Sequence, residues 1–425
     1  MKPVELNIWL NRWSALDSSL AEVIGNISGS EPRLVNLHAL AMCLRGFAGQ
    51  HFKYFYEGFN NASLKPSKVH PAEEVFRVIL DQVASDLEVI ERAASPIFLS
   101  SAAMHDTLIK AEGLAVEALS PAKSLGLDPL PTVITYFEKS PAIRLVPYAN
   151  VALVAVPFSA VKARRDLLAI PHEVGHCVFR HWYKPEHIAC RNPFPTVDQW
   201  CRNWVEEIFA DAYGCLVAGP LIALDFQDLQ CSDSDASFMS EDGHHPAPRL
   251  RPEVYTAVLD KIVAPVGPWD PGWSVALKNR WDSLSLARTA RTQLHLERAD
   301  PKVGLHVSLS DARLEVTKVI DRLFDNTGLR STLPSAKWQA ACPAAPPTPV
   351  ETIYDDFGQW IDPPDGKTPS SPDQPELACT SWDEKISGML GEPVAGLKQP
   401  VDPDLWELIW AIEDWITVPP ENYWP

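Results

Sequence analysis

The stretch that can do chemistry is His172-Glu173-Val174-Gly175-His176, a His-Glu-x-x-His pattern. On a helix, residues four apart project from one face, so the two imidazoles can bind one zinc ion together. Glu173 would then lie beside the water that the metal activates and would take its proton. With 12 histidines in 425 residues, roughly 0.02 such patterns are expected by chance, so the pattern favours a zinc site over two surface histidines.

A second stretch, Glu206 to Gly214, offers the third ligand that a catalytic zinc usually needs. Glu207 and Asp211 lie four residues apart in an otherwise apolar run, where an uncompensated carboxylate would be costly. We expect Glu207 to bind the metal and Asp211 to accept the N–H of His172, which fixes the tautomer of that ring. Glu206 projects in another direction on such a helix and is the weaker candidate.

Together, His-Glu-x-x-His and the downstream Glu-x-x-Ala-Asp-x-x-Gly resemble the gluzincin zinc metallopeptidases, in particular the branch related to the CAAX prenyl endopeptidase and its soluble relatives. The resemblance covers roughly residues 165–255. It implies that His172, His176 and Glu207 bind Zn²⁺, that Glu173 is the general base, and that Asp211 supports the ligands. Membrane-spanning segments typical of many relatives are missing, so a prenylated membrane substrate is not implied.

Members of that branch commonly carry a His-Pro followed by Arg, and here His245, Pro246 and Arg251 stand in that pattern. The resemblance implies that the His245 segment lines the cleft near the transition state and that Arg251 anchors it. An imidazole donor there could stabilise the oxyanion of a peptide carbonyl under attack. On chemistry alone His244 competes equally, and only the adjoining Pro246 favours His245.

Helices and a small sheet must position these residues. Apolar residues at three- and four-residue steps predict a helical amino-terminal region, with helices near residues 6–13, 34–47, 71–94 and 103–119. Between Pro129 and Phe158 the period changes to short β-branched runs, which predict strands at 133–137, 143–146 and 151–156. If the last is an exposed edge strand it could hold an extended peptide, and if it is interior it could not.

The active-site helix follows, starting between Ser159 and Asp166, with Pro171 placed where the helix must begin or bend. Further helices are expected at about 199–218, 252–263, 274–293 and 310–324. From Pro334 to Pro403 the composition shifts to Pro, Ser, Asp and Thr, but Trp338, Trp360 and Trp382 indicate a docked segment. A Trp-rich amphipathic helix at 402–416 ends the chain.

We therefore predict an α+β, zincin-like metallopeptidase fold, mostly helical, with a small mixed sheet next to the active-site helix. The predicted divisions are a helical region at 1–125, the metallopeptidase core at 126–333, and the Pro-rich segment with its Trp-rich helix at 334–425.

The net charge of −18 disfavours partners with an anionic backbone or surface, so neither nucleic-acid binding nor membrane insertion is expected. The amino terminus lacks the pattern of a secretory signal, and no apolar run approaches the ~20 residues that span a bilayer. Eight scattered cysteines without a Cys-x-x-Cys pair predict reduced thiols in a cytoplasmic protein.

The function predicted from these features is zinc-dependent hydrolysis of a peptide or protein substrate. Three alternatives remain open at this point. The first is a zinc hydrolase acting on a non-peptide bond, since the metal site does not choose the scissile group. The second is a metal-binding scaffold that captures a partner protein through its carboxy-terminal Trp-rich helix. The third is a latent protease held inactive by its own Pro-rich tail.

Overall fold

The computed structural model describes most of the chain, in two compact units. The described residues are 5–66, 71–99, 101–182, 196–232, 237–263, 267–296, 305–326, 334–363 and 372–390, together with 194, 234, 329 and 332. Unit 1 is drawn from residues 1–109, 131–155 and 371–425, and unit 2 from residues 110–130 and 156–370. The predicted division at residues 125 and 333 stays a prediction, and the predicted helix at 402–416 lies outside the described residues.

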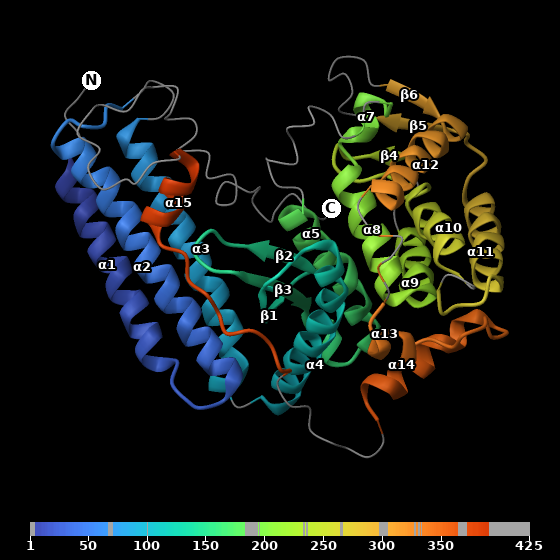
Figure 1. Cartoon of the computed structure of the whole chain (residues 1–425), viewed down its shortest axis with the longest axis horizontal. Coiled ribbons are helices and arrows are strands. Elements are labelled where there is room, and N and C mark those ends of the chain that lie inside the picture. Colours follow the sequence, from blue (N-terminus) through green and yellow to red (C-terminus); the bar gives the residue numbers. More distant parts are fainter. Residues whose placement is uncertain are drawn as a thin grey trace. The chain divides into compact units, whose positions relative to one another are not determined.

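Unit 1 is built on three long helices that lie side by side (Figure 1). Their bounds are α1 Leu6–Asn26, α2 Pro32–Asn60 and α3 Ala72–Phe98. Pro32 begins α2, a position where its missing N–H costs nothing, and Glu73 and Glu74 lie in the first turn of α3, where negative charge is favourable. The helices bury a shared apolar core. The sequence predicted all three from their apolar spacing, although each predicted range ends before its helix does.

A three-stranded sheet belongs mostly to the same unit, with strands β1 Thr132–Glu138, β2 Ala142–Leu145 and β3 Val151–Pro157. Its strand order is β1-β3-β2, and β2 pairs with β3 as an antiparallel hairpin in which Ala142 faces Ala155. Every residue of β3 is buried. The suggestion that β3 is an exposed edge strand for peptide binding is therefore wrong, because the near-continuous apolar run belongs to the central strand.

Residues 372–390 dock on unit 1 and end in α15 Trp382–Leu390. Backbone hydrogen bonds join Thr380 N–H to Tyr148 C=O at 2.8 Å, and the Trp382 ring is fully buried and stacks on His51 with centroids 3.8 Å apart. A disulfide joins Cys379 to Cys43. The prediction that all eight cysteines are reduced is wrong for this pair, because docking brings together two residues that are 336 positions apart in the chain.

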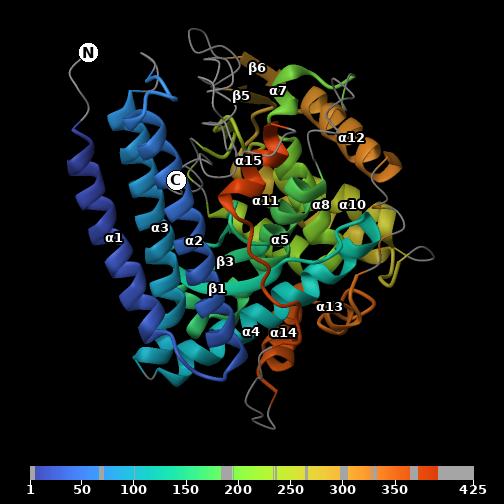
Figure 2. The ribbon, with the colours of Figure 1, turned by 60° about the vertical axis from the view of Figure 1, so that its left-hand side comes forward.

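Unit 2 contains the remaining helices, which Figure 2 shows from a second direction. The predicted helix at 199–218 is divided at Asn203 and Trp204, and the helix that follows it was not predicted. The bounds are α5 Ile170–Trp182, α7 Gln199–Arg202, α8 Val205–Ala218, α9 Pro220–Cys231, α10 Arg251–Ile262, α11 Gly272–Arg288, α12 Leu309–Asn326, α13 Ala336–Ala340 and α14 Ile353–Ile361, with α4 Ala102–Leu119 crossing into this unit.

A second small sheet in unit 2 consists of β4 Ser240–Glu241, β5 Gln293–Leu296 and β6 Leu305–Ser308. Strand β5 pairs in parallel with β4 and antiparallel with β6. Sequence analysis missed this sheet because its strands are only two to four residues long, too short for the alternation of apolar and polar residues in β5 and β6 to stand out. A mostly helical chain with two small sheets confirms the α+β class. Among the helices of the described residues, none is long and apolar enough to span a bilayer.

Two glycines let α5 and α8 pack backbone to backbone. A methyl group built on Gly175 would lie 2.7 Å from Ala210 Cα and 3.0 Å from the Ala210 carbonyl oxygen. On the other helix, a methyl group on Gly214 would lie 3.1 Å from the backbone nitrogen of His172. The distance from Gly175 to Ala210 Cα is shorter than real carbon contacts, and the distance at Gly214 is tighter than most, so a side chain at either position would push the two helices apart. This contact places α8 directly beside the His-Glu-x-x-His sequence.

Candidate metal centre

The helix that carries the His-Glu-x-x-His sequence starts one residue before its proline. Helix α5 begins at Ile170, so Pro171 is its second residue, where no intrahelical hydrogen bond is lost. The sequence left open whether the helix begins or bends at Pro171, and it begins there. The first predicted ligand, His172, follows immediately and is 2% exposed.

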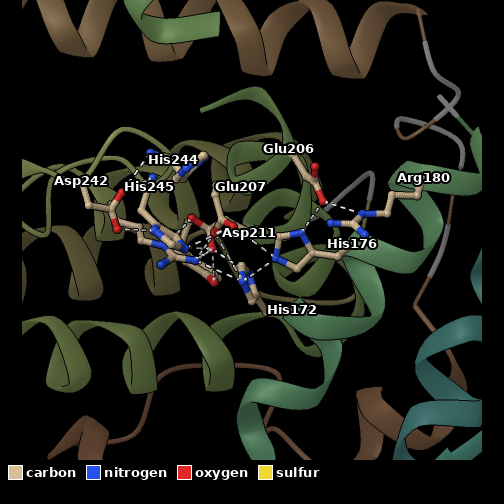
Figure 3. Close-up of polar contacts among 11 residues, drawn as sticks. His172, His176, Arg180, Glu206, Glu207, Asp211, Asp242, His244 and His245 are labelled. Atoms are coloured by element: carbon tan, nitrogen blue, oxygen red, sulfur yellow. Dashed lines mark hydrogen bonds and ion pairs between the residues drawn. The ribbon is translucent and has the colours of Figure 1, made fainter. Parts of the chain in front are cut away.

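Three ligand atoms converge between α5 and α8, as Figure 3 shows. His176 Nε2 lies 3.2 Å from His172 Nε2 and 3.4 Å from Glu207 Oε1. The remaining distance, from His172 Nε2 to Glu207 Oε2, is 3.6 Å. All three residues are buried. The three residues predicted from the sequence as ligands therefore form one compact group that could hold a metal ion.

These separations fit a tetrahedral zinc ion. Zinc binds histidine nitrogen and carboxylate oxygen at about 2.0–2.2 Å, which places neighbouring ligand atoms roughly 3.3 Å apart. The separations here are 3.2, 3.4 and 3.6 Å. Imidazole nitrogens and one carboxylate also form the donor set that zinc accepts in hydrolases. Donor type and spacing both fit zinc, although other divalent ions accept the same donors.

Asp211 and Arg251 flank the ring of His172. Asp211 Oδ1 lies 2.9 Å from His172 Nδ1, on the side of the ring away from the cluster, and it also accepts a 2.8 Å hydrogen bond from Tyr255 Oη. The Arg251 guanidinium donates from Nε to Asp211 Oδ2 at 3.0 Å and from Nη2 to Glu207 Oε2 at 2.8 Å. Arg251 therefore contacts the carboxylates of α8 directly, and its Nη2 lies only 3.1 Å from His172 Nε2.

His176 has a carboxylate partner that sequence reasoning missed. Glu206 Oε1 lies 3.1 Å from His176 Nδ1 and accepts a hydrogen bond of 3.1 Å from Arg180 Nε (Figure 3). Arg180 follows His176 by four residues on α5, which places both side chains on one face. The spacing of His176 and Arg180 is visible in the sequence, but Glu206 projects away from Glu207 on its helix, so the sequence alone does not connect it with His176.

Glu173 lies in the same helix turn and is 5% exposed. It makes no hydrogen bond or ion pair with the rest of the described residues, although it lies near enough to His176 to raise the pKa of that ring. A buried carboxylate without a protein partner keeps its acceptor atoms available for a substrate or a water molecule.

His245 reaches the cluster from the loop between β4 and α10, whereas His244 is exposed. Its Nε2 lies 3.4 Å from Glu207 Oε1, and its Nδ1 lies 2.6 Å from Asp242 Oδ2. Asp242 Oδ1 accepts the backbone N–H groups of both histidines, at 2.9 and 2.8 Å. The loop is therefore held by Asp242 in a conformation that directs His245 toward Glu207.

The electrostatics of the cluster favour a cation. Burial alone would lower the pKa of His176, but Glu207 and Glu206 outweigh it and raise that pKa to about 9. Burial likewise opposes ionisation of Glu206, yet His176 and Arg180 lower its pKa to about 2. Asp211 also stays ionised, because Arg251 and His172 outweigh its burial and lower its pKa. Ionised carboxylates around two imidazoles create a site where positive charge is favourable.

No known protein family, curated protein or solved structure matches this chain.

The geometry of the site is thus the basis for its interpretation. It combines a ligand set suited to a divalent metal, a buried carboxylate with no hydrogen-bond partner among the described residues, and a histidine directed at the cluster from a separate loop. Such a combination can bind a metal ion and place an acid–base group beside it.

Proposed function

We propose that this protein is a zinc-dependent peptidase with a zincin-like fold. The observation that carries the proposal is the convergence of three buried ligand atoms at 3.2–3.6 Å, with an unpartnered carboxylate one residue away from the first ligand. A site that only stored a metal would have no use for Glu173 there. The resemblance to gluzincin sequences supports peptide bonds as the target.

In this proposal His172, His176 and Glu207 hold zinc, which when bound lowers the pKa of a water molecule and polarises a carbonyl group. Glu173 accepts the proton of the attacking water and passes it to the leaving amine, which needs one group that alternates between base and acid. Glu206 accepts Nδ1–H of His176, and the Asp211 carboxylate lies 2.9 Å from Nδ1 of His172, so that the Nε2 atom of each ring is left for the metal.

His245 supplies the remaining function in the proposed mechanism. Its Nδ1–Asp242 contact of 2.6 Å fixes the ring and favours a protonated Nδ1. The proposed role is stabilisation of the carbonyl oxygen as negative charge develops on it, for which the ring must present a protonated Nε2. Asp242 assists by holding the ring with Nε2 directed toward the cluster.

The proposal is tested by incubating the zinc-loaded full chain with a peptide library and identifying the products by mass spectrometry. We expect cleavage at a defined set of sequences, loss of cleavage on chelation, and recovery when Zn²⁺ is restored. The Glu173→Gln variant serves as the control, since it should bind zinc and cleave at least about 10²-fold more slowly.

Two outcomes would replace the proposal. A chain that binds zinc stoichiometrically but cleaves no peptide, while hydrolysing ester or amide reporter compounds in a Glu173-dependent way, would be a hydrolase of non-peptide bonds. A chain that binds zinc and hydrolyses nothing would be a metal-binding scaffold. Inhibition by the Pro-rich tail, the third alternative, cannot be tested by deleting everything from Pro334. Trp338 is fully buried in unit 2 and its Nε1 donates to Leu114 C=O at 3.2 Å, so that deletion would disrupt the core of the unit.

A further inference from the structure

Two histidines outside the metal centre face each other across strands β5 and β6. His295 and His306 are direct partners in the antiparallel register. Side chains alternate between the two faces of a strand, so this pair lies on the face opposite to Leu294 and Leu296, which are buried. The imidazoles therefore project from one face of a sheet whose other face is anchored in the core of unit 2.

The spacing of this pair matches the spacing of the two proposed zinc ligands. The ring centroids of His295 and His306 are 5.0 Å apart, and those of His172 and His176 are 4.8 Å apart. Two imidazoles on one tetrahedral ion at about 2.0–2.1 Å are expected to have centroids roughly 5 Å apart. Direct cross-strand pairing holds this separation without a change in the backbone.

The hydrogen bonding of the pair leaves nitrogen atoms for a ligand. His295 Nδ1 is buried and has no hydrogen-bond partner among the described residues. The His306 side chain, which is exposed, makes no hydrogen bond or ion pair within that part of the chain. A buried polar atom without a partner costs free energy, and a bound cation would remove that cost.

We propose that His295 and His306 form a second metal site, which binds a divalent transition-metal cation through two imidazole nitrogens. Imidazole selects Cu²⁺, Ni²⁺ and Zn²⁺ over Mg²⁺ and Ca²⁺, and the usual stability order places Cu²⁺ above Zn²⁺ at such a site. With only two protein ligands, the site is weaker than the three-ligand centre and leaves positions for water or for a ligand from solution.

The site connects structurally to the metal centre. Strand β4 pairs with β5 through Ser240 and His295, and it ends at Glu241, immediately before Asp242. Asp242 holds His245 in the cluster. A cation that joins β5 to β6 would stiffen the sheet on which the His245 loop is supported.

The experiment is calorimetric titration of the full-length, metal-free chain with Zn²⁺ and, separately, with Cu²⁺. Wild type should bind a tight equivalent and a weaker one, and the weaker one should prefer Cu²⁺. His306→Gln should weaken only the second equivalent, by at least tenfold, and electron paramagnetic resonance of the Cu²⁺ form should lose the signal of one nitrogen ligand. Because His306 is exposed, its substitution should leave the fold intact, which circular dichroism will check.

Three comparisons make the result decisive. His105→Gln alters a half-buried histidine paired with Glu31 in unit 1 and should leave both equivalents unchanged. His172→Ala should remove only the tight equivalent, so failure of the metal centre and failure of the second site can be told apart. The second site is disproved if wild type binds no weaker equivalent, or if His306→Gln and His295→Gln both bind that equivalent with wild-type affinity.

Discussion

Glu206 Oε1 lies 3.1 Å from His176 Nδ1, on the side of the ring away from the ligand cluster, and Arg180 donates to the same oxygen at 3.1 Å. His172 has a corresponding arrangement with Asp211 and Arg251. Each proposed zinc ligand on α5 thus contacts a carboxylate from α8, and that carboxylate in turn contacts an arginine. The two carboxylates differ in exposure, since the Glu206 side chain is 33% exposed and Asp211 is completely buried.

Glu206→Ala should weaken zinc binding about 10- to 100-fold, the usual effect of removing the hydrogen-bond partner of a metal-bound histidine. The reason is that His176 loses the acceptor that keeps its proton on Nδ1. Zinc affinity measured by competition with a chromogenic chelator provides the test. Glu117→Ala is a matched control, because that side chain is 34% exposed and lies in the same unit without contacting the cluster. Equal affinities for wild type and Glu206→Ala would exclude this role.

Glu173→Gln should retain zinc and lower the rate of peptide hydrolysis by about 10²–10⁴-fold, the range expected for removal of a general base. Glutamine preserves the size of the side chain but cannot accept the proton of water. Zinc content and cleavage rate should be measured on the same preparation. If the variant cleaved at the wild-type rate, Glu173 would have no part in catalysis.

Gly175→Ala should destabilise unit 2 by about 1–3 kcal/mol, the cost of forcing a methyl group into a closely packed contact. The new carbon would meet the backbone of Ala210, which cannot move aside as a flexible side chain can. The same displacement should separate α8 from α5 and weaken zinc binding. Gly358→Ala, on α14, is the control, because no atom lies within 4 Å of its added methyl group. Urea unfolding and zinc affinity are the measurements, and wild-type values for Gly175→Ala would contradict the close helix contact.

The motif residues could be predicted from the sequence because their helical spacing alone determines which side chains share a face. His172 and His176 on one helix, and Glu207 and Asp211 on another, needed only the assumption that the two helices meet. The glycines that permit this meeting, Gly175 and Gly214, lie inside the same two patterns.

Features that depend on tertiary contact could not be predicted in this way. Glu206 reaches His176 only because α5 and α8 pack together, and Cys43 meets Cys379 only because a distant segment docks on α2. The apolar run of Val151–Val156 is compatible with an edge or a central strand, and only the strand order shows that it is central. Strands β5 and β6 are four residues each, and so short an alternation of apolar and polar residues does not reveal a sheet.

Asp225 should make stability depend on pH. Burial outweighs Arg165 and raises the pKa of this carboxyl group to about 6, from 3.8. Between these values the folded chain binds more protons than the unfolded chain, so this group's stabilising contribution is present below pH 3.8 and is lost as the pH rises through 6. A difference of about two units between the folded and unfolded pKa corresponds to roughly 3 kcal/mol of stability.

Asp225→Asn removes this titration and keeps an acceptor for Arg165. As the pH rises from 4.5 to 7, wild type loses this contribution and the variant does not, so the variant should become more stable relative to wild type. Urea unfolding of both proteins at the two pH values provides the measurement. A difference between the proteins that does not change with pH would show that Asp225 titrates normally in the folded state.

The most direct measurement is the zinc content of the purified full chain after dialysis, compared with that of His172→Ala and Glu207→Gln. We expect one tightly held zinc per wild-type chain, removed by a strong chelator and restored by added Zn²⁺, and a loss of tight binding in both variants. A wild-type chain that holds no metal, or variants that hold as much as wild type, would show that His172, His176 and Glu207 do not form a metal centre.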